Sequence, residues 1–96
     1  MMNKVQLYKI ISTYFTDKPV EKVMVFGSYS RNEQHEHSDV DIVIKPSKPL
    51  GLLVLAKFKQ DLTELLKLKV DLSTENGISA FVYPFIKNDL ETVYEQ

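Results

Sequence analysis

The chain has 96 residues, of which 44% are hydrophobic and 26% charged, and its formal net charge is -1. This length suits one compact domain spanning residues 1–96, and the composition excludes a disordered or fibrous class. A charge near zero, without a basic stripe or tail, disfavours binding to nucleic acid or anionic membranes. The absence of cysteine excludes disulfides and thiolate metal sites. No run approaches the roughly 18 apolar residues of a transmembrane helix, so we expect a cytoplasmic protein.

The first predicted element is an amphipathic helix, because apolar residues recur at spacings of three or four. The stripe comprises Val5, Leu7, Tyr8, Ile10, Ile11, Tyr14 and Phe15, and the helix ends at Asp17-Lys18-Pro19. Two short runs of β-branched and aromatic residues follow, at residues 22–26 and 40–45, and each is stopped by a glycine or a proline. Both runs predict strands.

A second helix is predicted from residue 50 to about residue 68, and we expect its leucines and Phe58 to be core. One face of it is marked by Leu55, Phe58, Leu62, Leu65 and Leu66. Residues 69–73 then predict a third strand. This order of elements predicts an α/β or α+β fold, in which a small mixed sheet of about three to four strands packs with helices.

The C-terminal part contains a further predicted helix that Pro84 should kink or bound, because proline lacks an amide donor. Its apolar residues are Ile78, Phe81, Val82, Phe85 and Ile86. Residues 91–95 are compatible with an extended segment. The aromatic residues Phe81, Tyr83, Phe85 and Tyr94 fit either the core or an exposed patch for a partner, and the sequence leaves both open.

Three aspartates stand at the start of two predicted strands. Side chains alternate between the faces of a strand, so Asp39 and Asp41 share one face with Val43, and the same parity places Asp71 on a polar face. If the strands of residues 22–26 and 40–45 are antiparallel, Gly27-Ser28 lies beside this acidic start. The intervening helix is the usual crossover for a parallel pair, which brings Asp71 to the same end.

This combination has the chemistry of a magnesium-triphosphate site. Two carboxylates about 4 Å apart repel by several kcal/mol unless a cation or a proton offsets them, and Mg²⁺ prefers such oxygen ligands together with substrate phosphates. Gly27 allows close backbone approach, Ser28 offers a hydroxyl and an amide, and a short helix starting there would aim its amides at an anion. Arg31 adds a forked phosphate donor.

Gly27-Ser28, followed by Asp39-Val40-Asp41 and by Val70-Asp71-Leu72, resembles the DNA polymerase β-like nucleotidyltransferase superfamily. More narrowly, the chain resembles the minimal nucleotidyltransferases (MNT), which are often antitoxins paired with a HEPN-type toxin. The resemblance covers nearly the whole chain and implies a polymerase β palm-like fold. No motif residue is missing, although residues 34–37 are not part of the family pattern.

The resemblance implies a role for each motif residue. Asp39 and Asp41 would hold two Mg²⁺ ions, and Asp71 would bind one ion and help to activate the attacking hydroxyl. Gly27, Ser28 and Arg31 would hold the nucleotide triphosphate, with ATP as the expected substrate. The implied reaction is AMP transfer to a hydroxyl, in particular a tyrosine of a HEPN-type toxin.

Other interpretations stay open from the sequence. The chain could be a non-catalytic nucleotide-binding antitoxin that masks its partner, or a subunit of a small-molecule nucleotidyltransferase resembling antibiotic-modifying enzymes. His35 and His37 have a spacing that suits a metal, but they lack a third partner in their loop, so we expect solvated side chains. We expect Tyr29 to serve packing rather than catalysis.

Overall fold

The computed structural model describes residues 2–33, 39–78, 80–81 and 83–96, so the expectations for His35, His37 and Val82 lie outside it. Its elements, in chain order, are α1 (Lys4–Phe15), β1 (Val20–Phe26), β2 (Val40–Pro46), α2 (Leu52–Leu66), β3 (Val70–Thr74), the 3₁₀ turn η1 (Glu75–Gly77), α3 (Tyr83–Ile86) and β4 (Glu91–Glu95). Within the described ranges no helix combines the length and apolar character that a membrane crossing needs.

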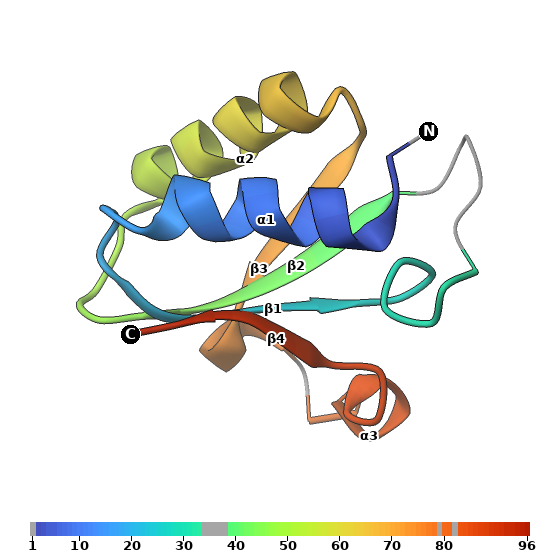
Figure 1. Cartoon of the computed structure of the whole chain (residues 1–96). Helices are drawn as coiled ribbons and strands as arrows, with labels where there is room; N and C mark the ends of the chain where they lie inside the picture. Colours follow the sequence, from blue (N-terminus) through green and yellow to red (C-terminus); the bar gives the residue numbers. More distant parts are fainter. Residues whose placement is uncertain (1, 34–38, 79, 82) are drawn as a thin grey trace.

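The four strands form one mixed sheet in the order β3-β2-β1-β4. Strand β1 is antiparallel to both β2 and β4, whereas β2 and β3 are parallel and are connected through α2. Helices α1 and α2 lie on one face of the sheet, and η1 and α3 lie on the other side (Figure 1). The predicted mixed fold, the antiparallel first pair and the helical crossover are therefore confirmed.

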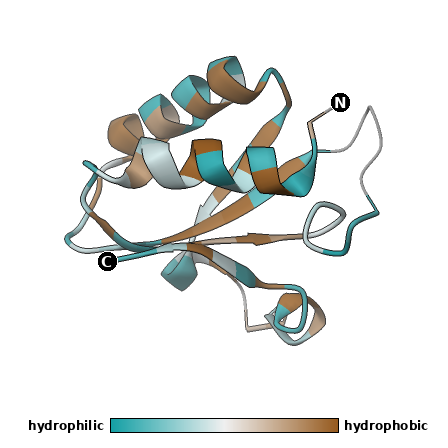
Figure 2. Cartoon of the chain, in the orientation of Figure 1, coloured by the Kyte–Doolittle hydropathy of each residue, from teal (hydrophilic) through white to brown (hydrophobic). Residues whose placement is uncertain are grey.

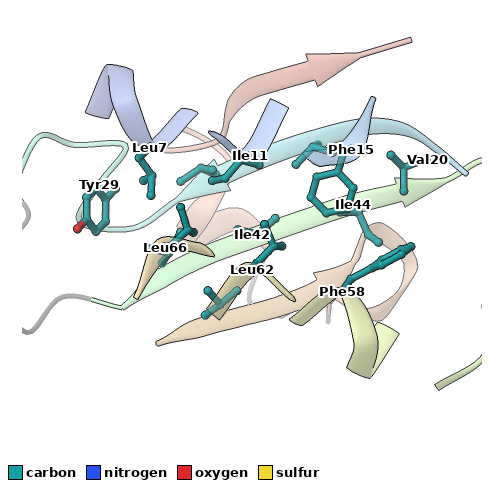
Figure 3. Packing of buried hydrophobic residues seen from close by; sticks show 14 residues of the cluster. Leu7, Ile11, Phe15, Val20, Tyr29, Ile42, Ile44, Phe58, Leu62 and Leu66 are labelled. Carbon is teal, nitrogen blue, oxygen red and sulfur yellow. The ribbon is translucent and has the colours of Figure 1, made fainter. Parts of the chain in front are cut away.

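The core lies between the two long helices and the sheet. Helix α1 contributes Leu7, Ile11 and Phe15, α2 contributes Phe58, Leu62 and Leu66, and these side chains meet the strand residues Val20, Ile42 and Ile44 (Figure 3). Hydropathy follows the same division, because the strands are largely apolar while both helices alternate between apolar and polar residues (Figure 2). Tyr29 is fully buried in this cluster, which agrees with a packing role.

Local signals explain where the two long helices begin and end. Helix α1 starts with a capping box, in which Asn3 Oδ1 accepts from the Gln6 amide at 2.8 Å and Gln6 Oε1 accepts from the Asn3 amide at 3.2 Å. Helix α2 is capped at its C-terminus by Lys67, whose left-handed φ of 55° stops the helical hydrogen-bond pattern. Tyr14 joins the two helices by donating to Asp61 Oδ2 at 2.7 Å.

The expectation that the leucines of α2 belong to the core was wrong for three of them. Leu52 and Leu53 of α2 are 85% and 87% exposed, and Leu65 is 51% exposed, because only the Phe58-Leu62-Leu66 face of that helix meets the sheet. Val43 is fully buried although it shares a strand face with Asp41. The sheet face that carries Asp41 and Val43 is therefore not open along its whole length, because η1 packs against β2.

The difference between the leucines of α2 leads to a stability prediction. Leu62→Ala should lower the free energy of unfolding by about 2–5 kcal/mol, because a buried leucine leaves a cavity as well as losing its transfer energy. Leu53→Ala is the matched control, and it should change stability by less than about 0.5 kcal/mol at an exposed position. Urea denaturation followed by circular dichroism measures both values. Similar losses in the two variants would contradict this placement of the core.

The C-terminal segment resolves an alternative that the sequence left open. Helix α3 spans only Tyr83–Ile86, so Ile78 and Phe81 of the predicted helix lie outside it, and Pro84 occupies its first turn, where its missing amide is tolerated. Phe81, Tyr83 and Phe85 are exposed, whereas Tyr94 of β4 packs against the core. Residues 91–95 form β4, as their extended character indicated.

Candidate functional site

The strand register brings two of the three aspartates together at one end of the sheet. Asp41 of β2 is paired with Asp71 of the parallel strand β3, and on its other side it is paired with Phe26 of β1. Asp39 directly precedes β2, and its Oδ2 atom lies 3.9 Å from Lys69 Nζ. Asp41 is half-buried and Asp71 is exposed, so this end of the sheet presents carboxylates to solvent.

Burial and the neighbouring carboxylates raise the pKa of Asp41 from its ordinary value of 3.8 to about 6. Burial of the carboxyl is the largest cause, followed by the negative charges of Asp71 and Asp39 and a hydrogen bond to Asp71, while the Arg31 guanidinium opposes the shift. The cluster therefore carries negative charge that its neighbours do not fully compensate. A bound cation would relieve this repulsion.

The donor set fits magnesium in its chemistry, because all three side chains offer hard carboxylate oxygens. In the part of the chain that the structure describes, no three histidine, aspartate or glutamate side chains are already arranged as a metal-binding group. The Asp39 side chain is 41% exposed, and its Oδ2 lies 3.9 Å from Lys69 Nζ.

Gly27 lies at the end of β1, directly against the acidic cluster. Its φ of +85° falls in the region that L side chains rarely adopt. A Cβ atom added there would lie 2.5 Å from Asp41 Oδ2. Both the backbone conformation and the space beside Asp41 thus require glycine.

Residues 27–33 form a succession of turns, and the predicted short helix after Gly27 is not present there. The Gly27 carbonyl accepts from the Arg31 amide at 3.2 Å and from Ser30 Oγ at 3.0 Å, and the Ser28 carbonyl accepts from the Glu33 amide at 2.8 Å. These bonds fold the segment back on itself. Backbone amides at the start of such a turn can bind an anion.

Arg31 has carboxylate partners that its sequence context did not indicate. Its Nη1 donates to Asp89 Oδ2 at 2.7 Å, and its Nε donates to Glu33 Oε2 at 3.3 Å. These carboxylates, Asp89 foremost, raise the pKa of the Arg31 side chain. The guanidinium partly opposes the rise in the pKa of Asp41, but two of its donors are already used by Asp89 and Glu33.

Lys4 is a second residue that the sequence did not single out. Its Nζ donates to the Ser30 carbonyl at 3.0 Å and also to Glu91 of β4, and its side chain is 22% exposed. One ammonium group thus connects the first turn of α1, the 27–33 turn and β4. No local pattern marks such a lysine, because its partners lie far away in the sequence.

Removing this ammonium should loosen the 27–33 turn. Lys4→Met keeps most of the apolar stem but leaves the Ser30 carbonyl and Glu91 without their shared donor, so we expect a loss of about 1 kcal/mol in the free energy of unfolding. Lys57→Met is the control, because Lys57 pairs with Asp61 within one helix at 2.9 Å and is 70% exposed. Thermal unfolding compares the two variants, and an equal melting temperature for both would refute a special role of Lys4.

A polar hollow of about 410 Å³ lies elsewhere on the molecule. It is lined by Glu21, Lys22, Lys45, Glu75, Glu95 and Gln96. Lys22 and Lys45 are register partners in strands β1 and β2. They lie near one end of this strand pair, and the partners Phe26 and Asp41 lie at the other end. The hollow is therefore separate from the acidic cluster, and its mixed charges form surface pairs of little selectivity.

The chain is similar to known nucleotidyltransferases in sequence and in structure. The nucleotidyltransferase domain family matches residues 6–92. The relative named "Putative protein adenylyltransferase MJ0126", from Methanocaldococcus jannaschii, is 44% identical over 72 residues, which cover 75% of this chain and 70% of that protein. A solved structure described as a "putative minimal nucleotidyltransferase" has a TM-score of 0.79 at 26% identity and covers 94% of this chain and 95% of its own.

A further similarity concerns a toxin-antitoxin complex. A chain in the structure of a tri-AMPylated Shewanella oneidensis HEPN toxin in complex with an MNT antitoxin has a TM-score of 0.76. At 19% identity, covering 97% of this chain and 73% of that one, this similarity shows the fold alone. The family match includes the strands β1, β2 and β3 and every candidate residue between Gly27 and Asp71. The chain therefore belongs to the nucleotidyltransferase domain family, and it is a nucleotidyltransferase.

Proposed function

We propose that this nucleotidyltransferase transfers AMP from ATP to a tyrosine hydroxyl of a HEPN-type toxin and so acts as an antitoxin in the cytoplasm. Residues 1–96 form one nucleotidyltransferase domain in this proposal. The observation that supports it is the pairing of Asp41 with Asp71 at the end of the sheet where Gly27 lies against Asp41. The adenylyltransferase name of the relative supports AMP as the transferred group.

Each residue has a defined task in this reaction. The backbone of Gly27 and the amide and hydroxyl of Ser28 hold the triphosphate, and Arg31 pairs with its oxygens. Asp39, Asp41 and Asp71 would hold two Mg²⁺ ions. When bound, magnesium would neutralise charge on the phosphates and lower the pKa of the acceptor hydroxyl.

The transfer itself is a displacement at the α-phosphorus of ATP. The acceptor oxygen forms a new bond to that phosphorus, while the bond between the α-phosphorus and the oxygen bridging to the β-phosphate breaks. Pyrophosphate leaves with the electron pair of that bond. The proton of the acceptor hydroxyl passes to the carboxylate of Asp71, which is exposed and able to reach an incoming acceptor.

A protein acceptor fits the open surface beside the carboxylates. Within the described residues Asp71 faces solvent, and helix α3, which contains the exposed residues Tyr83 and Phe85, lies on the side of the sheet away from α1 and α2 (Figure 1). A docked partner would exclude water and align its hydroxyl for attack. The AMP group would then add bulk and negative charge to the partner.

Mass spectrometry of the partner tests this proposal. A HEPN-type toxin is incubated with the protein, ATP and magnesium, and we expect the mass of the partner to rise by one or more AMP groups on tyrosine. The wild-type protein without ATP and the Asp41→Asn variant with ATP serve as controls. A partner that is neutralised without any adduct would show masking instead, and adenylylation of small hydroxylated compounds alone would show a small-molecule enzyme.

A further inference from the structure

The guanidinium of Arg31 is held by a carboxylate from a distant part of the chain. Asp89 lies in the turn between α3 and β4, and its Oδ2 is 2.7 Å from Arg31 Nη1. Its side chain is 26% exposed, compared with 65% for Glu33, the second partner. The Asp89 amide donates to the Ile86 carbonyl at 2.9 Å, so the turn itself fixes this residue. Asp89 is thus the better placed of the two partners.

A triphosphate and Asp89 both bind the positive charge of the Arg31 guanidinium. Both are anions that bind a guanidinium through charge-assisted hydrogen bonds, and Arg31 uses Nη1 for Asp89 and Nε for Glu33. A phosphate oxygen that takes the Nη1–H bonded to Asp89 must displace that carboxylate, whereas a phosphate on another guanidinium N–H must share the positive charge of Arg31 with Asp89.

We propose that Asp89 competes with the nucleotide triphosphate for Arg31 and thereby sets the nucleotide affinity of this site. This inference rests on the proposed function, because it concerns the same triphosphate site. Asp89 acts through Arg31, so it is a positioning residue rather than a catalytic one. Nothing in the sequence around Arg31 indicates this pairing, since the two residues are 58 positions apart.

Calorimetric titration with ATP tests the competition. Asp89→Asn keeps the shape of the side chain and removes its charge, and it should tighten ATP binding about 3- to 10-fold at fixed ionic strength. Glu33→Gln is the matched control, and its more exposed and longer contact should give a change below about 2-fold. Titrations with and without magnesium separate the effect on Arg31 from any effect on metal binding, because Asp89 is not among the proposed ligands.

A double-mutant cycle identifies Arg31 as the route of the effect. In an Arg31→Ala background, Asp89→Asn should lose most of its gain, because no guanidinium remains to be released. The inference is overturned if Asp89→Asn leaves ATP binding unchanged or weaker, or if the gain persists fully without Arg31. If the wild-type protein binds no ATP even with magnesium, the proposed function and this inference both fail. If the wild-type protein binds ATP but Asp89→Asn does not tighten binding, only this inference fails.

Discussion

Asp41→Asn should lower the rate of AMP transfer at least about 100-fold while leaving the fold intact. Asp41 is the central carboxylate of the cluster, since it pairs with Asp71 and lies against Gly27. Loss of even an outer-shell partner of a metal ligand typically costs 10–100-fold, and a proposed ligand should cost more. Transfer of labelled AMP from ATP to the partner measures this effect.

The same substitution should stabilise the metal-free protein at neutral pH. Asp41 is an acid whose pKa in the folded protein, about 6, exceeds its ordinary value of 3.8, so the folded state binds the proton more tightly than the unfolded chain. Its contribution to stability is present at low pH and is lost as the pH rises from about 4 to about 6. Solvent screens this half-exposed carboxylate, so we expect a gain of about 1–2 kcal/mol for Asp41→Asn above pH 6.

Glu64→Gln is the control for this pair of measurements. It removes one negative charge from the exposed face of α2, away from the cluster. Neither the rate of AMP transfer nor the pH dependence of stability should therefore change. Thermal unfolding in the presence of a chelator, at pH 4 and at pH 7, measures the stability difference between each variant and the wild type. Full transfer activity in Asp41→Asn would overturn the proposed ligand role, and a stability gain equal at both pH values would contradict the charge argument.

The fold was largely predictable because its signals are local. The period of the apolar residues located both long helices, and the β-branched runs located β1, β2 and β3 to within two residues. Burial was less predictable, because it depends on which face a partner covers. Leu53 and Leu62 have the same side chain in the same helix, yet one is exposed and the other is buried.

The candidate site was predictable where it depends on strand parity and was missed where it depends on distant pairs. Parity and crossover rules placed Asp41 beside Asp71, and the register confirms that pairing. The contacts of Lys4 with Ser30 and of Arg31 with Asp89 join elements that only the completed sheet brings together. No periodicity or motif within a short window contains that information.

Gly27→Ala should lower the free energy of unfolding by about 2–4 kcal/mol and strongly reduce AMP transfer. A φ of +85° costs a residue with a Cβ about 1–3 kcal/mol. The new methyl group would also meet Asp41 Oδ2 at 2.5 Å, so the carboxylate or the turn must move. For a chain of this size the loss corresponds to a fall of roughly 10–25 °C in melting temperature.

Gly51→Ala provides the matched control for Gly27→Ala. Gly51 has an ordinary φ of -77°, and a Cβ added there would meet nothing within 4 Å, so its stability should change by less than about 0.5 kcal/mol. The double variant Gly27→Ala with Asp41→Ala separates the two causes, because it removes the collision but keeps the strained backbone. Its melting temperature should lie above the value expected from adding the two single effects. Equal melting temperatures for Gly27→Ala and Gly51→Ala would show that the turn adapts freely, and the close packing of Gly27 against Asp41 would then not shape the site.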